Sequence, residues 1–264
     1  MKSDLSKLEE IHGSLLSLIT PSGYEVVIRQ QNGEDDDILS NAGNVADGTS
    51  SNKFVKEIVV STNITENKKF NLDDARDLKL CDKYFIMVAS RIFSIGQYIK
   101  FSYKWPDNLE VDYEEDLGLL IWEYGNPDKP CPEKGSPDYY EFRIKPHKFG
   151  KDKSKEIKLS SGKLIRYYFM NGHGERYLMN LPMDQQSINA ELKARGIELN
   201  VNNNWVKIQN FKTFSSIDMM EIRKDVTEND RIINLITILE HPETKEKFEY
   251  PIIGTADFFY PRGI

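Results

Sequence analysis

Histidines, cysteines and a run of acidic residues are the side chains whose types could support catalysis or metal binding in this sequence. The histidines lack the His-x-x-x-His or His-x-Glu spacing of a metal site. They also lack a convincing partner for general base catalysis. His173, in the segment Asn171-Gly-His-Gly-Glu175, is the one that we retain as a candidate general base. The four histidines are His12, His147, His173 and His241.

The acidic run Glu34 to Asp37 is a candidate site for a hard cation such as calcium. Four consecutive carboxylates do not have the alternating ligand spacing of a calcium-binding loop. Runs of like charge usually form solvated surface. We therefore expect a solvated acidic turn here.

The two cysteines, Cys81 and Cys131, do not suggest a metal site or a nucleophile. Cys131-Pro-Glu-Lys134 looks like half a zinc knuckle with lysine in place of the second cysteine, and two cysteines cannot supply four thiolates. Their unmatched surroundings favour reduced thiols in a cytosol over a disulfide. The segment Asn171 to Gly174 also lacks the length and the Lys-Ser/Thr of a phosphate-binding loop. The sequence thus predicts no catalytic residue, no cofactor and no metal.

The composition is that of a chain that folds and that lacks the basic surface expected of a nucleic-acid-binding protein. Its 264 residues are 39% hydrophobic, and the formal net charge is −7. This length can bury a core without disulfides, whereas a nucleic-acid partner would call for a basic surface. The one basic stretch, 145–158, is expected to be a solvated linker. Because no apolar run approaches about 18 residues, no membrane span is predicted.

Hydrophobic periodicity outlines the elements of the first half. An amphipathic helix is expected over 1–20, where acidic residues interrupt what would otherwise resemble a signal peptide. Strands are expected over 24–30 and 54–62, with a polar loop between them. A helix is predicted over 71–94, capped by Asn71. A hairpin follows, with strands 98–104 and 109–113.

The second half repeats this order. Ser22-Gly23 and Asn32-Gly33 recur as Ser161-Gly162 and Asn171-Gly172, each 139 residues later. Leu39 and Asn41 recur as Leu178 and Asn180. A helix capped at 215 or 216 and a hairpin over 234–250 then follow. Self-similarity at a fixed offset indicates a tandem duplication.

The predicted fold class is therefore α+β, with two similar lobes that each pack a mainly antiparallel sheet with hairpins on a helix. The first lobe is expected over 21–124 and the second over 158–264, after the N-terminal helix 1–20. The segment 125–157 is rich in proline and charge and reads as a linker between them.

Several apolar and aromatic positions are typical of protein–protein contact surfaces. They lie on the N-terminal helix, at the first Asn-Gly pair, around the linker and in the C-terminal tail. The candidate contact residues are Leu5, Leu8, Leu15, Asn32, Gly33, Trp105, Trp122, Tyr139, Tyr140, Phe258, Phe259 and Tyr260.

Three stretches carry a family resemblance: PSGYEVVIR with NGEDDDIL, then DKYFIMVASRIFSIGQYIKF, and finally ADFFYP. Together they resemble the baseplate hub and tail-assembly proteins of contractile-tailed bacteriophages, the group that includes the distal hub subunit of T-even-type baseplates. The family pattern falls here on Asp82, Arg91, Ser94 and Gly96, and on the ending Phe258-Phe259-x-Pro261. Some members carry zinc-ribbon cysteines at a hairpin tip, where this chain has Trp105-Pro-Asp-Asn108.

The resemblance implies a structural virion protein, assembled in the bacterial cytoplasm into a tail baseplate through contacts with other tail proteins in a hetero-oligomer. Two similar lobes would suit quasi-equivalent partners. A tail assembly chaperone that leaves before maturation stays open as an alternative. So does a cytosolic enzyme whose site is assembled from scattered residues such as Asp35, His173 and Glu175.

Overall fold

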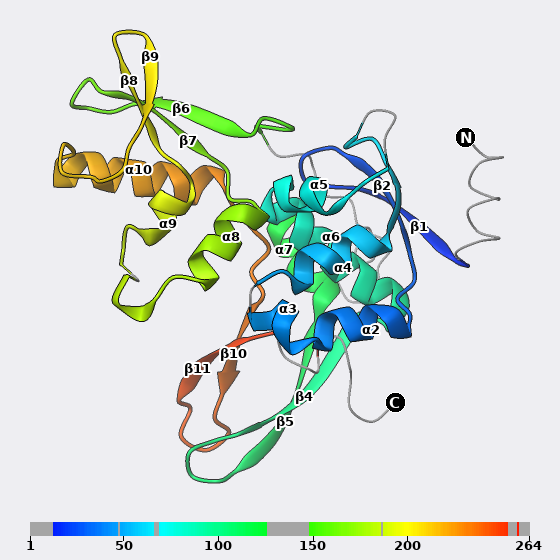
Figure 1. The fold of residues 1–264 in the computed structure, drawn as a ribbon. Coiled ribbons are helices and arrows are strands. Elements are labelled where there is room, and N and C mark those ends of the chain that lie inside the picture. The colour runs from blue at the N-terminus through cyan, green and yellow to red at the C-terminus, as the bar shows by residue number, and fades with distance from the viewer. Residues whose placement is uncertain are drawn as a thin grey trace.

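A computed structural model describes residues 13–46, 48–65, 69–125, 148–185, 187–252 and Phe258. The fold is mixed α+β, with antiparallel sheets packed against helices (Figure 1), which confirms the predicted class. An arm made of two hairpins projects from the body at the bottom of Figure 1.

The first half builds a three-stranded sheet followed by helices. Strands β1 and β2 form a hairpin, and β3 adds to β2 in the order β1-β2-β3, all antiparallel. The elements are β1 (Leu15–Ile19), β2 (Glu25–Arg29), α2 (Gly33–Ser40), α3 (Ala42–Ala46), α4 (Ser50–Ile58), β3 (Val59–Thr62), α5 (Leu72–Asp77), α6 (Leu80–Ser94), β4 (Tyr98–Lys104), β5 (Glu110–Asp116) and α7 (Leu117–Gly125).

The second half builds a four-stranded antiparallel sheet, in the order β6-β7-β8-β9. Its elements are β6 (Ser154–Lys158), β7 (Leu164–Tyr168), α8 (Gly172–Met179), the 3-10 turn η2 (Met183–Gln185), α9 (Ala190–Ala194), β8 (Glu198–Val201), β9 (Asn204–Lys207), α10 (Ser216–Asn229), β10 (Ile236–Glu240) and β11 (Lys247–Pro251).

The offset of 139 residues seen in the sequence also relates the elements. Adding 139 to both bounds of β1, β2, α2 and β3 gives the bounds of β6, β7, α8 and β8. The hairpin register is the same, because Leu15 pairs with Arg29 and Ser154 pairs with Tyr168. Gly23 and Gly162 adopt φ of 82° and 85° in the two turns, a conformation that glycine reaches without steric cost.

The two Asn-Gly pairs begin helices and do not form hairpin turns. The side chain of Asn32 accepts a hydrogen bond from Glu34 N, and that of Asn171 accepts from His173 N and Gly174 N. Each asparagine therefore caps the helix that follows it. Asn71 and Ser215 cap α5 and α10 as predicted.

Three predictions of local structure were wrong. The helix predicted over 1–20 is a strand at its C-terminal end, because Leu15–Ile19 pairs with β2; residues 1–12 lie outside the described residues. The strand predicted over 54–62 begins as α4, whose Phe54, Val55 and Ile58 share one buried face at helical spacing. Part of the loop predicted before it is also helical, as α3 and the start of α4.

The helix predicted over 71–94 is divided into α5 and α6. The interruption lies where the second half contacts the first: Lys79 bridges to Asn171, and Leu80 N donates to Met170 O over 2.8 Å. Lys83 of α6 is fully buried and forms an ion pair with Glu175 of α8. Contacts between the two halves thus determine where the predicted helix is divided into α5 and α6.

Two hydrophobic clusters form the core, and their boundary differs from the predicted lobes. The smaller cluster comes from the second half alone and includes Ile165, Tyr167 and Ile222. The larger one contains the first half together with Ile233, Leu235, Leu239, Ile252 and Phe258. The segment after α10, predicted to belong to the lobe 158–264, therefore completes the core of the first half.

Candidate functional site

Helix α6 carries the Asp-Arg-Ser pattern of the resemblance, and each of the three side chains holds a different segment of the chain. Asp82 Oδ1 accepts from Ser22 N at 2.8 Å, in the Pro-Ser-Gly turn. Ser94 Oγ accepts from Gln31 N at 2.9 Å, just before the cap of α2. The pattern thus fixes the β1–β2 turn and the start of α2 against one helix.

Arg91 is the third of these residues and is only 1% exposed. Its Nε donates to Phe258 O at 2.6 Å, and its Nη1 donates to Gly96 O at 2.5 Å. The fork of the guanidinium suits two carbonyl acceptors at once. Burial lowers the pKa of Arg91. Arg91 therefore ties the C-terminal segment to the end of α6.

The arm is built from two hairpins that lie side by side, β4–β5 from the first half and β10–β11 from the second (Figure 1). Their facing sides carry aromatic rings. Phe101 stacks on Tyr250 with centroids 4.8 Å apart and planes 6° apart, and Tyr103 stacks on Phe248 at 5.2 Å. Such pairs add to the free energy gained by burying the rings. The inner faces of the hairpins therefore stabilise each other.

His241 closes the tip of the arm. Its ring contacts Trp105 edge-on with centroids 4.9 Å apart, and Nε2 lies 3.1 Å from Asp107 Oδ2 in the other hairpin. Nδ1 accepts hydrogen bonds from Glu243 N and Thr244 N. Because Nδ1 is an acceptor, the proton of the neutral ring is on Nε2 and is donated to Asp107. Within the described residues His241 thus has a structural role.

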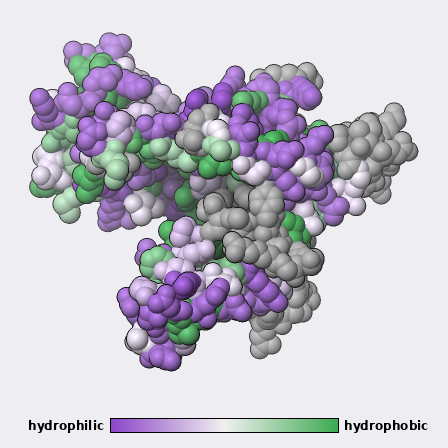
Figure 2. Space-filling model, turned by 60° about the horizontal axis from the view of Figure 1, so that its bottom comes forward, coloured by the Kyte–Doolittle hydropathy of each residue, from purple (hydrophilic) through white to green (hydrophobic). Residues whose placement is uncertain are grey.

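The two outer faces of the arm differ in chemistry. On β4–β5 the outer face carries charged and polar pairs, such as Lys100 opposite Glu114 and Ser102 opposite Asp112. On β10–β11 it carries Ile236 and Ile238, which are 43% and 62% exposed. Figure 2 shows a mainly hydrophilic surface on which such hydrophobic residues are scattered. The outer face of β10–β11 therefore presents two exposed isoleucines beside the charged residues Glu240, Lys247 and Glu249.

Sequence reasoning did not select Ile236 or Ile238, although a signal was present. The segment Ile236-Thr-Ile-Leu239 has apolar residues at alternating and adjacent positions. In a two-stranded hairpin one of its faces must point away from the core. Isoleucines at alternate positions, with Leu239 on the opposite face, thus indicate that both faces of this strand carry apolar side chains.

The predicted contact residues lie in different surroundings. Leu15 is half-buried in β1, and Asn32 and Gly33 are exposed at the start of α2. Trp105 is 3% exposed and Phe258 is fully buried in the core of this chain, so neither offers a free surface. Aromatic packing and the Arg91 hydrogen bond account for their burial. Trp122 lies on α7, and Leu5, Leu8, Tyr139, Tyr140, Phe259 and Tyr260 lie outside the described residues.

The acidic run is not the solvated turn that was predicted. It forms the first part of α2, where Asp35 is fully buried and accepts two hydrogen bonds from Arg29, at 2.6 and 2.8 Å. Its Oδ2 also accepts from Asn32 N, which completes a capping box. A buried carboxylate requires such partners.

The residues of the enzyme alternative have separate partners. Asp35 pairs with Arg29, and Glu175 pairs with Lys83 and accepts a hydrogen bond from Tyr84. His173 is 54% exposed at its side chain and lies 3.4 Å from Asp77. The described contacts therefore do not unite the three in one catalytic group.

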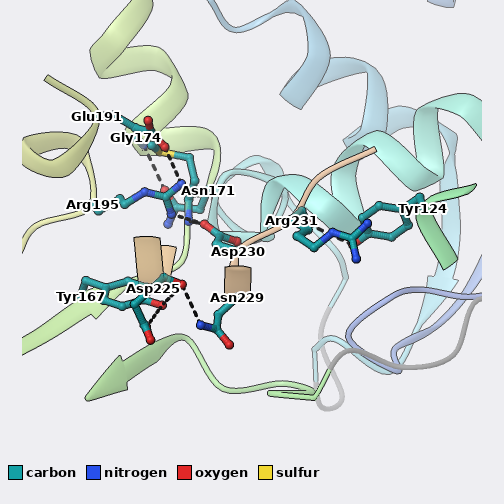
Figure 3. Close-up of polar contacts among 11 residues, drawn as sticks. Tyr124, Tyr167, Asn171, Gly174, Glu191, Arg195, Asp225, Asn229, Asp230 and Arg231 are labelled. Atoms are coloured by element: carbon teal, nitrogen blue, oxygen red, sulfur yellow. Dashed lines mark hydrogen bonds and ion pairs between the residues drawn. The ribbon is translucent and has the colours of Figure 1, made fainter. Parts of the chain in front are cut away.

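A polar cluster joins the helices and strands of the second half (Figure 3). Arg195 lies between Asp230 and Glu191, while Asp225 accepts from Tyr167 and from Asn229. At the boundary with the first half, Tyr124 donates to the carbonyl of Arg231 at 3.1 Å. These contacts orient α10 between the two cores.

Among the residues that the structure describes, no three metal-ligating side chains gather closely enough to hold a metal ion. No helix in those ranges is long and apolar enough to cross a bilayer. Comparison of the chain with protein-family models, curated proteins and solved structures gave no match.

Proposed function

We propose that this protein is a structural component of a bacteriophage tail baseplate, a hub or tail-tip subunit that acts through protein–protein contacts during tail assembly. One observation carries the proposal: the residues that bear the resemblance come together around α6. Asp82, Arg91 and Ser94 each hold a distant segment, and Phe258 of the Phe-Phe-x-Pro ending is the partner of Arg91. Motifs scattered over the sequence thus share one architectural role.

The arm supports the same proposal. It projects from the body (Figures 1 and 2), and its aromatic interior makes it a fixed extension of the core. One outer face bears Ile236 and Ile238 at 43% and 62% exposure. In a hetero-oligomeric assembly this face would be covered by a neighbouring tail protein. Assembly would take place in the host cytoplasm, and the protein would remain in the virion.

The test is quantitative mass spectrometry of gradient-purified particles from the host, with the major tail-tube protein as the reference. We expect a few copies per particle. Abundance in infected lysate with absence from particles would instead identify a tail assembly chaperone. Absence from both particles and tail intermediates would reject both phage roles.

Two variants test whether the outer face of β10–β11 makes the contact that incorporates the protein into particles. Ile238→Lys replaces one of the two exposed isoleucines on the outer face of β10–β11 by a charge and should reduce the copy number in particles at least about tenfold. Ser102→Lys places the same charge on the polar outer face of β4–β5 and should leave it unchanged. Both substitutions are on outer faces, so matched thermal unfolding of the two purified variants is the control. Equal incorporation of the two variants would exclude the β10–β11 face as the contact.

A further inference from the structure

A groove of about 710 Å³ lies on the second half, between the start of α8, the turn that joins α9 to β8, and the end of β9. The turn is centred on Gly196, which has φ of 64° and whose N–H donates to Lys193 O at 3.0 Å. A Cβ on Gly196 would meet only Lys207 Cε and Tyr168 Cδ2, each at 3.9 Å. Lys193, Lys207 and Tyr168 thus surround one turn that carries no side chain.

Two positive charges of this groove have no partner within the described part of the chain. No hydrogen bond or ion pair there engages the ammonium group of Lys193 or of Lys207, and both residues are exposed. A lysine ammonium group combines a full charge with three hydrogen-bond donors, and it is a frequent ligand of phosphate groups in proteins. The groove therefore suits an anion.

The other strongly charged side chains that line the groove are already paired. Arg195 is 5% exposed, and its guanidinium lies between Asp230 and Glu191 (Figure 3). Glu198 is the carboxylate among the described lining residues, and it accepts hydrogen bonds from Arg166. Because these groups balance one another, the two lysines set the sign of the charge in the groove.

The helix that borders the groove has lost the acidic start of its equivalent in the first half. The first turn of α2 contains Glu34 and Asp35. At the offset of 139 residues, α8 has His173 and Gly174 instead, and both of them line the groove. The second half therefore lacks two carboxylates that would oppose an anion at this place.

Two aromatic rings line the same groove. Tyr168 and Tyr177 are 37% and 43% exposed. Tyr168 also lies next to Lys207 at the Gly196 turn. Flat ligand rings stack favourably on aromatic side chains. The groove thus presents a positively charged end and a ring surface side by side.

We propose that this groove binds a small phosphorylated ligand that carries a flat ring, with the size and chemistry of a nucleoside monophosphate. The phosphate lies between the ammonium groups of Lys193 and Lys207, and the ring packs on Tyr168. The volume of the groove falls within the range of small-molecule sites, about 300–1,000 Å³. This inference does not rest on the proposed function, since it needs no tail protein as a partner.

The first experiment uses adenosine monophosphate (AMP) as the probe. Isotope-labelled full-length protein is titrated with AMP, and the backbone amides are followed by NMR. We expect saturable shifts at Lys193, Gly196 and Lys207. Adenosine lacks the phosphate and ribose 5-phosphate lacks the flat ring, so each should bind at least about tenfold more weakly than AMP. No saturable shift at these amides up to millimolar AMP would overturn the proposal, and so would equal binding of AMP and either truncated ligand.

Variants of the protein test the two lysines. Lys193→Gln and Lys207→Gln each remove one positive charge from the groove and should each weaken AMP binding at least about tenfold. Lys158→Gln removes the same charge from an exposed position of β6 that does not line the groove, and it should leave binding unchanged. Equal affinity of the three variants for AMP would contradict the site.

A second pair of variants tests the change of charge between the halves. His173→Glu introduces the carboxylate that α2 has at Glu34 and should weaken AMP binding by repulsion of the phosphate. His173→Gln is the uncharged control of similar size. If the two variants bound AMP equally well, the acidic start of the helix would not decide between the halves, and the anion site would be rejected.

Discussion

Arg91 donates a hydrogen bond through Nε to the carbonyl oxygen of Phe258, 167 residues further along the chain. The two residues belong to separate motifs, one on α6 and one near the C-terminus. Both side chains are buried. Replacing Arg91 would leave the carbonyl of Phe258 without this donor, and replacing Phe258 would expose the groups around Arg91.

Arg91→Lys should lower the free energy of unfolding by about 2–3 kcal/mol, because a lysine cannot reproduce the forked hydrogen bonds to Phe258 O and Gly96 O. Phe258→Ala should cost about 3–5 kcal/mol through the cavity that it leaves. Chemical denaturation of the single and double variants is the measurement. We expect the double variant to lose less than the sum of the two, since the sites are coupled. Strict additivity would show that the contact contributes no coupling.

Gly172→Ala should destabilise the protein by about 1–3 kcal/mol. A Cβ at Gly172 would lie 2.4 Å from Asn52 Oδ1 and 3.1 Å from Arg76 Cα. Gly33 is the equivalent residue of the first half, and a Cβ there would meet nothing within 4 Å. Gly33→Ala is therefore the matched control and should be neutral or slightly stabilising. Thermal unfolding of both variants decides, and equal melting temperatures would refute the close approach at Gly172.

Tyr250→Ala should separate the two hairpins of the arm at a cost of about 1–3 kcal/mol, because the ring stacks on Phe101 and also meets Tyr103 edge-on. Amide exchange should accelerate in β10–β11 and remain unchanged in β6–β9, which belong to the other hydrophobic cluster. Glu249→Ala, on the outer face of the same strand, is the control. Uniform acceleration in all sheets would mean that the arm does not open independently.

Asp82→Asn should be more stable than the wild type at neutral pH, and this difference should vanish at acid pH. Burial raises the pKa of Asp82, and hydrogen bonds from Ser22 and Thr20 oppose this only in part. Since the folded pKa lies above the ordinary 3.8, wild-type stability falls as pH rises from 3.8 through the folded value. Asparagine keeps an acceptor for Ser22 N but does not ionise. The gain of the variant over the wild type should thus appear above pH 3.8 and vanish below it, as measured by denaturation from pH 3 to 7.

Asp218→Asn should show the opposite pH dependence. The hydrogen bond from Lys163, followed by those from Ser161 and Ser215, holds the pKa of Asp218 well below 3.8. Its stabilising effect is therefore present above pH 3.8 and is lost as pH falls through the folded value. The variant should be less stable than the wild type at pH 7, and the difference should shrink in acid. The same sign for both variants would contradict the different surroundings of the two carboxyls.

Local signals in the sequence predicted much of the fold. Turn and cap residues placed both hairpin turns and the caps at Asn71 and Ser215, and the 139-residue offset matched equivalent elements. The strand predicted at 54–62 failed because Val55 and Ile58 suit a buried helix face as well as a strand. Tertiary packing decided between the two.

Long-range pairings could not be predicted from local patterns. Nothing near Lys83 shows that it would pair with Glu175, and nothing near Tyr250 shows that it would stack on Phe101. For the candidate contacts, aromatic type alone did not distinguish a ring that packs inside, such as Trp105, from a surface residue. Exposure at Ile238 followed only from how the two hairpins meet.

Residues of 233–252, together with Phe258, complete the core of the first half, and this sets an order of events during synthesis. A ribosome releases the first half long before β10, β11 and Phe258 exist. Until then Phe101 and Tyr103 lack the rings of Tyr250 and Phe248 that cover them, and the guanidinium of Arg91 lacks one of its carbonyls. The second half, whose cluster needs nothing beyond Val226, can fold before the first half is finished. The part of the chain that is made first is thus completed last, and a stalled or truncated chain would display the aromatic face of β4–β5 to chaperones and proteases.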